Sequence, residues 1–107
     1  MIQEAYVSFE IAKLLKEKGF DIPLKTNYIS GNTYYLMPTH QMALAWLRKK
    51  NIYIIIKPFL EDSHFFGWII YAENSKGEVF YEEHIQEMLS YEEATEAAIK
   101  YALENLI

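Results

Sequence analysis

The chain has 107 residues, of which 51% are hydrophobic and 23% are charged, and it carries a net charge of −5 at neutral pH. This composition excludes an intrinsically disordered chain, and the length is typical of one domain with one hydrophobic core, so we expect a single domain over residues 1–107. Cysteine is absent, which excludes a disulfide framework, a thiolate zinc site and a cysteine nucleophile.

We expect no targeting or membrane segment in this chain. Residues Met1 to Tyr6 lack a basic region followed by an apolar stretch, as a signal peptide requires. The longest apolar runs are far shorter than the ~20 residues that cross a bilayer. We therefore expect a cytoplasmic protein without a membrane partner.

The first predicted helix spans Ser8 to Lys18. Ser8 can accept a hydrogen bond from the free N–H groups of a helix start, and apolar residues follow on one stripe. Gly19 can adopt the left-handed conformation that ends a helix, and Phe20 can pack back on Leu15 as in a Schellman closure. The sequence thus predicts both ends of this helix.

Residues 21–37 carry a weaker pattern. Pro23 prevents the helix from continuing, and Ser30-Gly31-Asn32 is typical of a turn between two short stretches that contain tyrosine. We expect a hairpin or a long loop here.

The second predicted helix begins at Thr39. Its apolar residues occupy most of its circumference, which indicates a largely buried helix. Arg48-Lys49-Lys50 complements the negative end of the helix dipole, and Asn51 is a plausible left-handed terminator.

Three strands are expected after this helix. Ile52 to Lys57 alternates as a strand that ends at Pro58, and Phe65 to Ala72 is apolar on both alternations, as in a central strand. A turn at residues 74–77 then leads into Glu78 to Glu82. These segments predict an antiparallel meander.

The last predicted helix has a clear start signal, since Ser90-Tyr91-Glu92-Glu93 is a capping box. Ala94, Ala98 and Ala102 belong to a face of small residues that permits close approach to a sheet. The opposite, solvent side is expected to carry four charged residues, with Glu96 and Lys100 paired at i, i+4: Glu93, Glu96, Lys100 and Glu104.

The order of these elements predicts the fold class. Helix, possible hairpin, helix, three strands and helix is typical of an α+β fold, with helices against one face of an antiparallel three-stranded meander. An N-terminal strand or the hairpin could extend that sheet.

Three stretches of the chain resemble a known group of proteins: Tyr6 to Phe20, Pro38 to Asn51, and Ser90 to Ile107. They are similar to small proteins encoded by phages and prophages of Bacteroides-type bacteria, and the similarity covers most of the chain. That family has no assigned activity and no assigned catalytic residues. The resemblance therefore implies an origin in a mobile element of a bacterial cytoplasm and gives no residue a role.

No recognised catalytic, metal or nucleotide motif is present. A metal or catalytic site would have to bring His40, His64 and His84 together with nearby carboxylates, and no two of these histidines have helical i, i+4 spacing. Adjacent strand residues point to opposite faces, so Glu82 and Glu83 would not cooperate in catalysis. An enzyme or metal protein is the third hypothesis, and we expect no cofactor.

The alternative hypothesis is nucleic-acid binding by Arg48, Lys49 and Lys50 together with exposed tyrosines, because lysines meet phosphates and bases stack on aromatic rings. Helix capping explains the same three charges. The acidic total also disfavours a nucleic-acid partner.

The leading hypothesis is a contact surface on the sheet. If the helices cover the face that bears Trp68, Ile70, Val79 and Tyr81, the other face carries an apolar patch beside Lys57 and Glu82. The residues of this patch are Tyr53, Ile55, Ile69, Tyr71 and Phe80. Such a patch is typical of protein interfaces, although residues 1–6 or 20–36 could instead fold over it. We therefore expect a non-enzymatic phage or prophage accessory protein that binds another protein or forms a homodimer.

Overall fold

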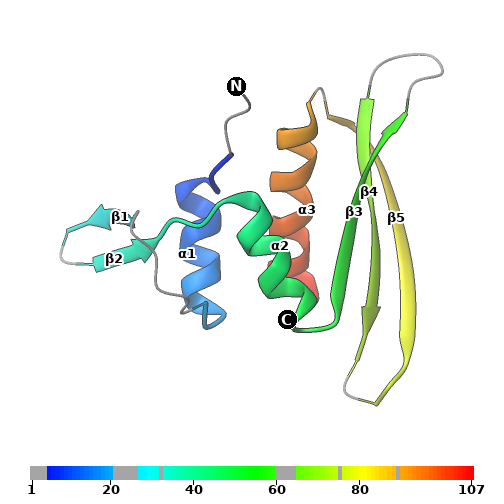
Figure 1. The fold of residues 1–107 in the computed structure, drawn as a ribbon, viewed down its shortest axis with the longest axis horizontal. Coiled ribbons are helices and arrows are strands. Elements are labelled where there is room, and N and C mark those ends of the chain that lie inside the picture. Colours follow the sequence, from blue (N-terminus) through cyan, green and yellow to red (C-terminus); the bar gives the residue numbers. More distant parts are fainter. Residues whose placement is uncertain (1–4, 21–26, 32, 60–64, 75, 89) are drawn as a thin grey trace.

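The computed structural model describes residues 5–20, 27–31, 33–59, 65–74, 76–88 and 90–107. The elements follow the predicted order (Figure 1). They are α1 (Phe9–Glu17), β1 (Asn27–Ser30), β2 (Thr33–Leu36), α2 (His40–Arg48), β3 (Ile52–Phe59), β4 (Phe65–Glu73), β5 (Val79–Met88) and α3 (Tyr91–Asn105). The α+β class is confirmed.

The elements form layers. Strands β3, β4 and β5 make one antiparallel sheet in that order, and α2 and α3 pack against one of its faces. Helix α1 contacts α3 and β2 and lies farther from the sheet (Figure 1). No helix in the described part of the chain has the length and apolarity that a membrane span requires.

The hairpin β1–β2 exists, but it does not extend the meander. It forms a two-stranded sheet of its own, turning at Gly31 with a φ of 61°. It packs on α1, where the Tyr35 ring meets Phe9 edge to face at 5.2 Å and the Lys16 Nζ lies 4.9 Å from the centre of the Tyr35 ring. Contacts with the first helix therefore decide its position.

The helix starts are those expected from the sequence. The side-chain oxygens of Ser8, Thr39 and Ser90 accept hydrogen bonds from the backbone N–H three residues later, at 3.2, 3.2 and 3.1 Å. Each bond satisfies one of the N–H groups that a first turn leaves free.

The predicted helix ends are confirmed as well. After α1, Gly19 has a φ of 93°, and the N–H of Phe20 donates to the Leu15 carbonyl at 2.9 Å, which is the Schellman arrangement. After α2, Asn51 is the left-handed residue, with a φ of 62°.

Two strand ends differ from the prediction by two residues or more. Strand β3 continues through Pro58 to Phe59, and β5 extends to Met88 instead of ending at Glu82. Glu73 N–H donates to the Asn51 carbonyl, so the backbone groups of Asn51 and of every second residue after it point toward β4. Pro58 belongs to the other set, and its backbone nitrogen therefore points away from β4. A proline at that position of an edge strand removes no ladder bond.

The expected facing of β5 was wrong by one residue. Ala72 pairs with Phe80 and Tyr71 pairs with Tyr81, so Phe80 lies on the side of the helices and Tyr81 on the opposite side. Phe80 packs against the core, whereas Tyr81 and Val79 are exposed. The sequence Val79-Phe80-Tyr81 is apolar on both alternations, so its pattern does not determine which residues face inward.

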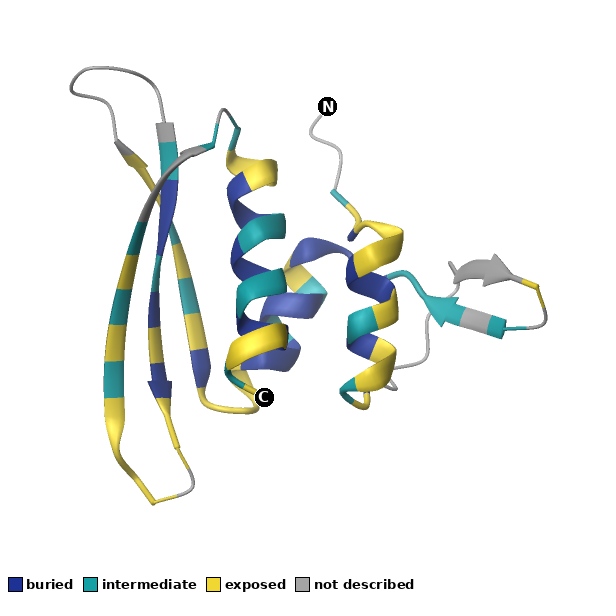
Figure 2. Ribbon diagram, turned by 180° about the vertical axis from the view of Figure 1, so that it is seen from behind, coloured by how far each residue is buried: buried dark blue, intermediate teal, exposed yellow. Residues whose placement is uncertain are grey.

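The core lies between the sheet and α2 and α3, and it extends to α1. Buried positions alternate with exposed ones along the strands (Figure 2). On α3 the predicted face of small residues is confirmed, because Ala94, Ala98 and Ala102 are fully buried. The small alanine side chains allow α3 to approach the sheet closely without glycine at these positions.

Candidate interaction surface

The side of the sheet away from the helices carries a row of three tyrosines. Tyr53, Tyr71 and Tyr81 lie directly opposite one another on β3, β4 and β5. Between 41% and 51% of each residue is exposed, and the rings of Tyr71 and Tyr81 are 5.2 Å apart. Directly paired rings of this kind stabilise a sheet and at the same time present an aromatic surface.

The next row adds apolar area and charge. Ile55, which is 49% exposed, pairs with Ile69, and Ile69 pairs with Glu83. We call this side of the sheet the open face; its described residues are Tyr53, Ile55, Lys57, Gly67, Ile69, Tyr71, Glu73, Val79, Tyr81 and Glu83. Four of the five residues predicted for the contact surface belong to it, and Phe80 does not.

The segments that were expected as alternative covers lie elsewhere where the structure describes them. Residues 5–7 run beside residues 38–40, with Val7 N–H donating to the Pro38 carbonyl at 3.0 Å. The hairpin packs on α1, beyond the helices (Figure 1). Within the described parts of residues 1–36, no segment covers the open face.

The open face is acidic at its β5 side. The Tyr81 hydroxyl donates to Glu83 Oε2 at 2.6 Å, and this bond raises the pKa of Tyr81. Tyr81 therefore stays protonated and remains a donor to the Glu83 side chain, which lies beside the tyrosine row. Glu73 adds a second exposed carboxylate on the same face.

On the covered side of the sheet, an aromatic cluster joins β4, β5 and α3. The His84 ring stacks on Trp68, with centroids 5.1 Å apart, and lies 4.4 Å from the Tyr101 ring. Glu82 Oε2 accepts from the Tyr101 hydroxyl at 2.6 Å and from His84 Nε2 at 3.1 Å. Both bonds lower the pKa of Glu82, and the bond from Tyr101 has the larger effect.

Sequence reasoning missed this cluster, because Glu82 was expected beside the open face. The one-residue error in the expected facing of β5 put Glu82 on the wrong side together with Phe80. Glu83 is on the opposite face, so the expectation that the two adjacent glutamates point to opposite sides of the sheet is confirmed. The indole Nε1 of the buried Trp68 has no hydrogen-bond partner in the described structure.

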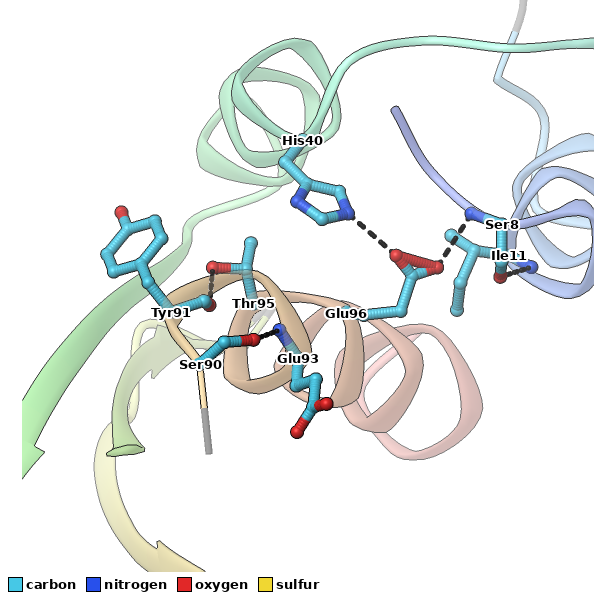
Figure 3. Close-up of polar contacts among 8 residues, drawn as sticks. All are labelled: Ser8, Ile11, His40, Ser90, Tyr91, Glu93, Thr95 and Glu96. Atoms are coloured by element: carbon cyan, nitrogen blue, oxygen red, sulfur yellow. Dashed lines mark hydrogen bonds and ion pairs between the residues drawn. The ribbon is translucent and has the colours of Figure 1, made fainter. Parts of the chain in front are cut away.

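A second polar network joins the three helices at Glu96 (Figure 3). Its carboxylate accepts from His40 Nε2 at 2.6 Å and from the backbone N–H of Ser8 at 2.7 Å. Burial raises the pKa of the Glu96 carboxyl, but the hydrogen bonds from His40 and Ser8 outweigh it, so the net pKa lies below its ordinary value of 4.5. Glu96 is therefore a carboxylate at the starts of α1 and α2, where the helix dipoles favour negative charge.

The expected solvent role of Glu96 was wrong. It does not pair with Lys100, whose Nζ instead meets Glu10 Oε1 at 2.8 Å and whose pKa this contact raises. The pairing changed because α1 packs against α3 and brings Ser8 and Glu10 to that side of the helix. No local signal in the sequence of α3 reveals this neighbour.

The Ser8, His40 and Glu96 network does not have the geometry of a nucleophilic triad. In such a triad the histidine lies between the nucleophile and the acid. Here Glu96 lies between the other two residues, and Ser8 Oγ accepts from Ile11 N–H as a helix cap. Two open grooves of about 330 and 410 Å³ flank Glu96, lined in common by Ser8, Glu93 and Glu96.

The basic cluster has the capping position that was expected. Arg48 is in the last turn of α2, Lys49 is its C-cap, and the Lys50 Nζ lies 4.7 Å from the centre of the Trp46 ring. These residues are exposed at the turn between α2 and β3. They follow a helix that packs on the covered side, whereas the tyrosine row lies on the open face.

The histidines are not brought together as a metal site among the residues that the structure describes. His40 pairs with Glu96, and His84 pairs with Glu82 and contacts Tyr101, so they meet different turns of α3. The described residues contain no group of three or more potential ligands that could hold a metal ion. His64 and Asp62 lie outside the described residues.

Comparisons with protein-family models, with curated proteins and with solved structures found no match for this chain.

Proposed function

We propose that this protein is a non-enzymatic protein-binding module whose contact surface is the open face. The observation that supports this most directly is the tyrosine row, in which three exposed rings lie side by side across the sheet. Tyrosine is enriched in interface cores, because it combines a large apolar ring with a hydroxyl group and loses little conformational entropy on binding. Ile55 and Val79 extend the apolar area on both sides of the row.

The charges of the open face favour a partner with an apolar patch and basic residues at its rim. Glu73 and Glu83 both lie beside the tyrosines, with Lys57 at the other end of the face. An arginine of the partner can stack on a tyrosine ring and bind Glu83 at the same time. The net charge of −5 supports the same polarity for long-range attraction.

The polar clusters away from the open face give no support to a catalytic function. The Glu96 and Glu82 networks each bond residues of different elements, and a low pKa makes either carboxyl a poor general acid near neutral pH. Their interactions are explained by packing of α3, so we propose no catalytic role for them.

The test is a comparison of three baits in affinity capture from a bacterial lysate: the wild type, Tyr71→Ser and Tyr6→Ser. Tyr6 is the matched control, because it is 45% exposed against 41% for Tyr71 but lies off the open face. A specific partner should be captured by the wild type and by Tyr6→Ser and should be lost with Tyr71→Ser. Circular dichroism confirms that each bait is folded.

The captured protein is then purified and its affinity is measured by titration calorimetry. Removing a central interface tyrosine costs about 2 kcal/mol, which is a roughly 30-fold rise in the dissociation constant. An equal affinity of the wild type and Tyr71→Ser would exclude the open face as the contact surface.

Nucleic-acid binding is the alternative proposal, because exposed tyrosines on a sheet can stack on bases. The acidic residues beside the row and the position of Arg48, Lys49 and Lys50 at the α2–β3 turn favour it less. It predicts binding of a labelled single-stranded oligonucleotide that weakens strongly between about 50 and about 200 mM salt. Charge reversal at the three basic positions should abolish that binding.

The biological setting stays a prediction from the sequence. An accessory role in a phage or prophage, in a bacterial cytoplasm, is compatible with a small binding module. Finding the captured partner in a phage-infected host would support it.

A further inference from the structure

The edge of β3 offers a second surface, which is distinct from the open face. In the order β3-β4-β5, β3 pairs with β4 on one side, and no described strand pairs with its other side. The bond from Glu73 N–H to the Asn51 carbonyl fixes the alternation, so the backbone groups of Ile52, Ile54 and Ile56 point away from β4. Pro58 ends this free ladder, because it has no N–H group.

The other free edge of the sheet is less suited to strand pairing. In β5 the bond from Asn74 N–H to the Glu78 carbonyl turns the backbone groups of Val79, Tyr81 and Glu83 outward. Strand β5 carries several glutamates, and its pairing with β4 shifts register between Phe66 and Trp68 of β4. Charges and irregularities of this kind oppose the addition of another strand, whereas β3 is regular and rich in isoleucine from Ile52 to Ile56.

We infer that two copies of this chain pair along the β3 edge in antiparallel orientation, with Ile54 of one copy opposite Ile54 of the other. This register pairs Ile52 with Ile56 of the second copy and forms about six backbone hydrogen bonds. It uses all three outward N–H groups of the strand. Neither copy has to place Pro58 inside the new ladder, because that residue lies beyond its end.

The side chains fit the same two-fold register. On the open face, Tyr53 comes opposite Ile55 of the second copy, and such aromatic and β-branched pairs stabilise a ladder. On the covered side, the partly buried Ile54 comes opposite Ile54 of the second copy, and the partly buried Ile56 comes opposite Ile52. The Ile54 pair lies on the two-fold axis and forms once, whereas the other two pairs form twice because of the symmetry.

Charge complementarity points to a second copy as well. The register places Lys57 opposite Asn51 of the second copy. Within that copy, Asn51 lies beside Glu73 of β4. Lys57 and Glu73 of the second copy are then two strands apart, about 10 Å, on the same face. Their long side chains can span that distance, and the pair forms twice.

The dimer goes beyond the proposed function, because it concerns the edge of the sheet and not the open face. It also enlarges the open face, since the two sheets become one sheet of six strands with two tyrosine rows. Binding of a different protein to that face does not depend on the edge, so the two proposals can fail separately.

The first test is the mass of the protein by light scattering after gel filtration, at several concentrations. The wild type should have the mass of a dimer, and Ile54→Pro should be monomeric. Tyr81→Pro is the matched control, because its N–H points outward at the free edge of β5, and this variant should stay dimeric. A monomeric wild type, or a dimer that persists in Ile54→Pro, would overturn the inference.

The second test does not depend on a proline variant that folds. The chain has no cysteine, so Ile54→Cys introduces one thiol per copy. In the proposed register the two Cα atoms of residue 54 are about 5.5 Å apart, within the range of a disulfide. Mild oxidation should give a covalent dimer.

The control for the register is Ile56→Cys. Residues 56 of the two copies are four positions out of register, about 13 Å apart, and should not cross-link. Cross-linking of Ile56→Cys but not Ile54→Cys would refute the register, and cross-linking of neither would refute the dimer. Capture of the partner by Tyr71→Ser, with these results unchanged, would remove only the proposed function.

Discussion

The Glu96 carboxylate connects three helices through hydrogen bonds. It extends from α3 to the start of α1 through Ser8 N–H and to the start of α2 through His40 Nε2. The side chain of His40 is 7% exposed and that of Glu96 is 27% exposed. Loss of the carboxylate would therefore leave a buried imidazole N–H without its acceptor, which is costly.

We predict that Glu96→Gln lowers the free energy of unfolding by about 2 kcal/mol at neutral pH, because a hydrogen bond to a charged group is lost. The folded-state pKa of Glu96 is below 4.5, so its contribution is fully present above that value and is lost as the pH falls through the folded-state pKa. The gap between wild type and variant should therefore shrink in acid. Urea unfolding across this pH range measures it.

The control for this prediction is Glu104→Gln, an exposed glutamate on the same helix. It should change stability little at any pH. An equal loss in both variants, or a gap that persists in acid, would contradict the role of Glu96.

At the scale of elements, the helix ends are determined by short local patterns. Ser8, Thr39 and Ser90 cap the three helices, and Gly19 and Asn51 end two of them in the left-handed conformation. These features depend on residues within one turn of each other, so they could be recognised without knowledge of the fold.

Replacing Ser90 by alanine should lower the free energy of unfolding by about 1 kcal/mol, since Glu93 N–H then loses its acceptor. Ser90→Asp should restore most of the loss, because a carboxylate caps equally well and suits the helix dipole. Chemical denaturation of the three proteins tests this. If aspartate were as destabilising as alanine, capping would not explain the role of this serine.

At the scale of the molecule, the two faces of the sheet differ in what covers them. Helices α2 and α3 bury Trp68 and Ile70, whereas the tyrosine row on the other side is exposed. This difference makes the open face available for a partner, and it gives neighbouring residues of one strand opposite roles.

Phe80 and Tyr81 provide a direct test of this arrangement. Phe80→Ala should lower the free energy of unfolding by about 2 kcal/mol, because its ring packs against the core, while Tyr81→Ala should cost less than about 1 kcal/mol. Thermal and urea unfolding of both variants measure the difference. The reverse order would mean that the facing of β5 is the opposite one.

Local sequence patterns were sufficient to predict the element order, the α+β class, the caps and the apolar face of α3, because each depends on residues close together in the chain. They also predicted that Tyr53, Ile55, Ile69 and Tyr71 share one face, since strand alternation is local. The tertiary structure alone decided the inward side of β5, the Glu96 junction and the separate hairpin. Phe80, Glu96 and Tyr35 owe their positions to partners from other elements, and strand pairing and helix packing choose those partners.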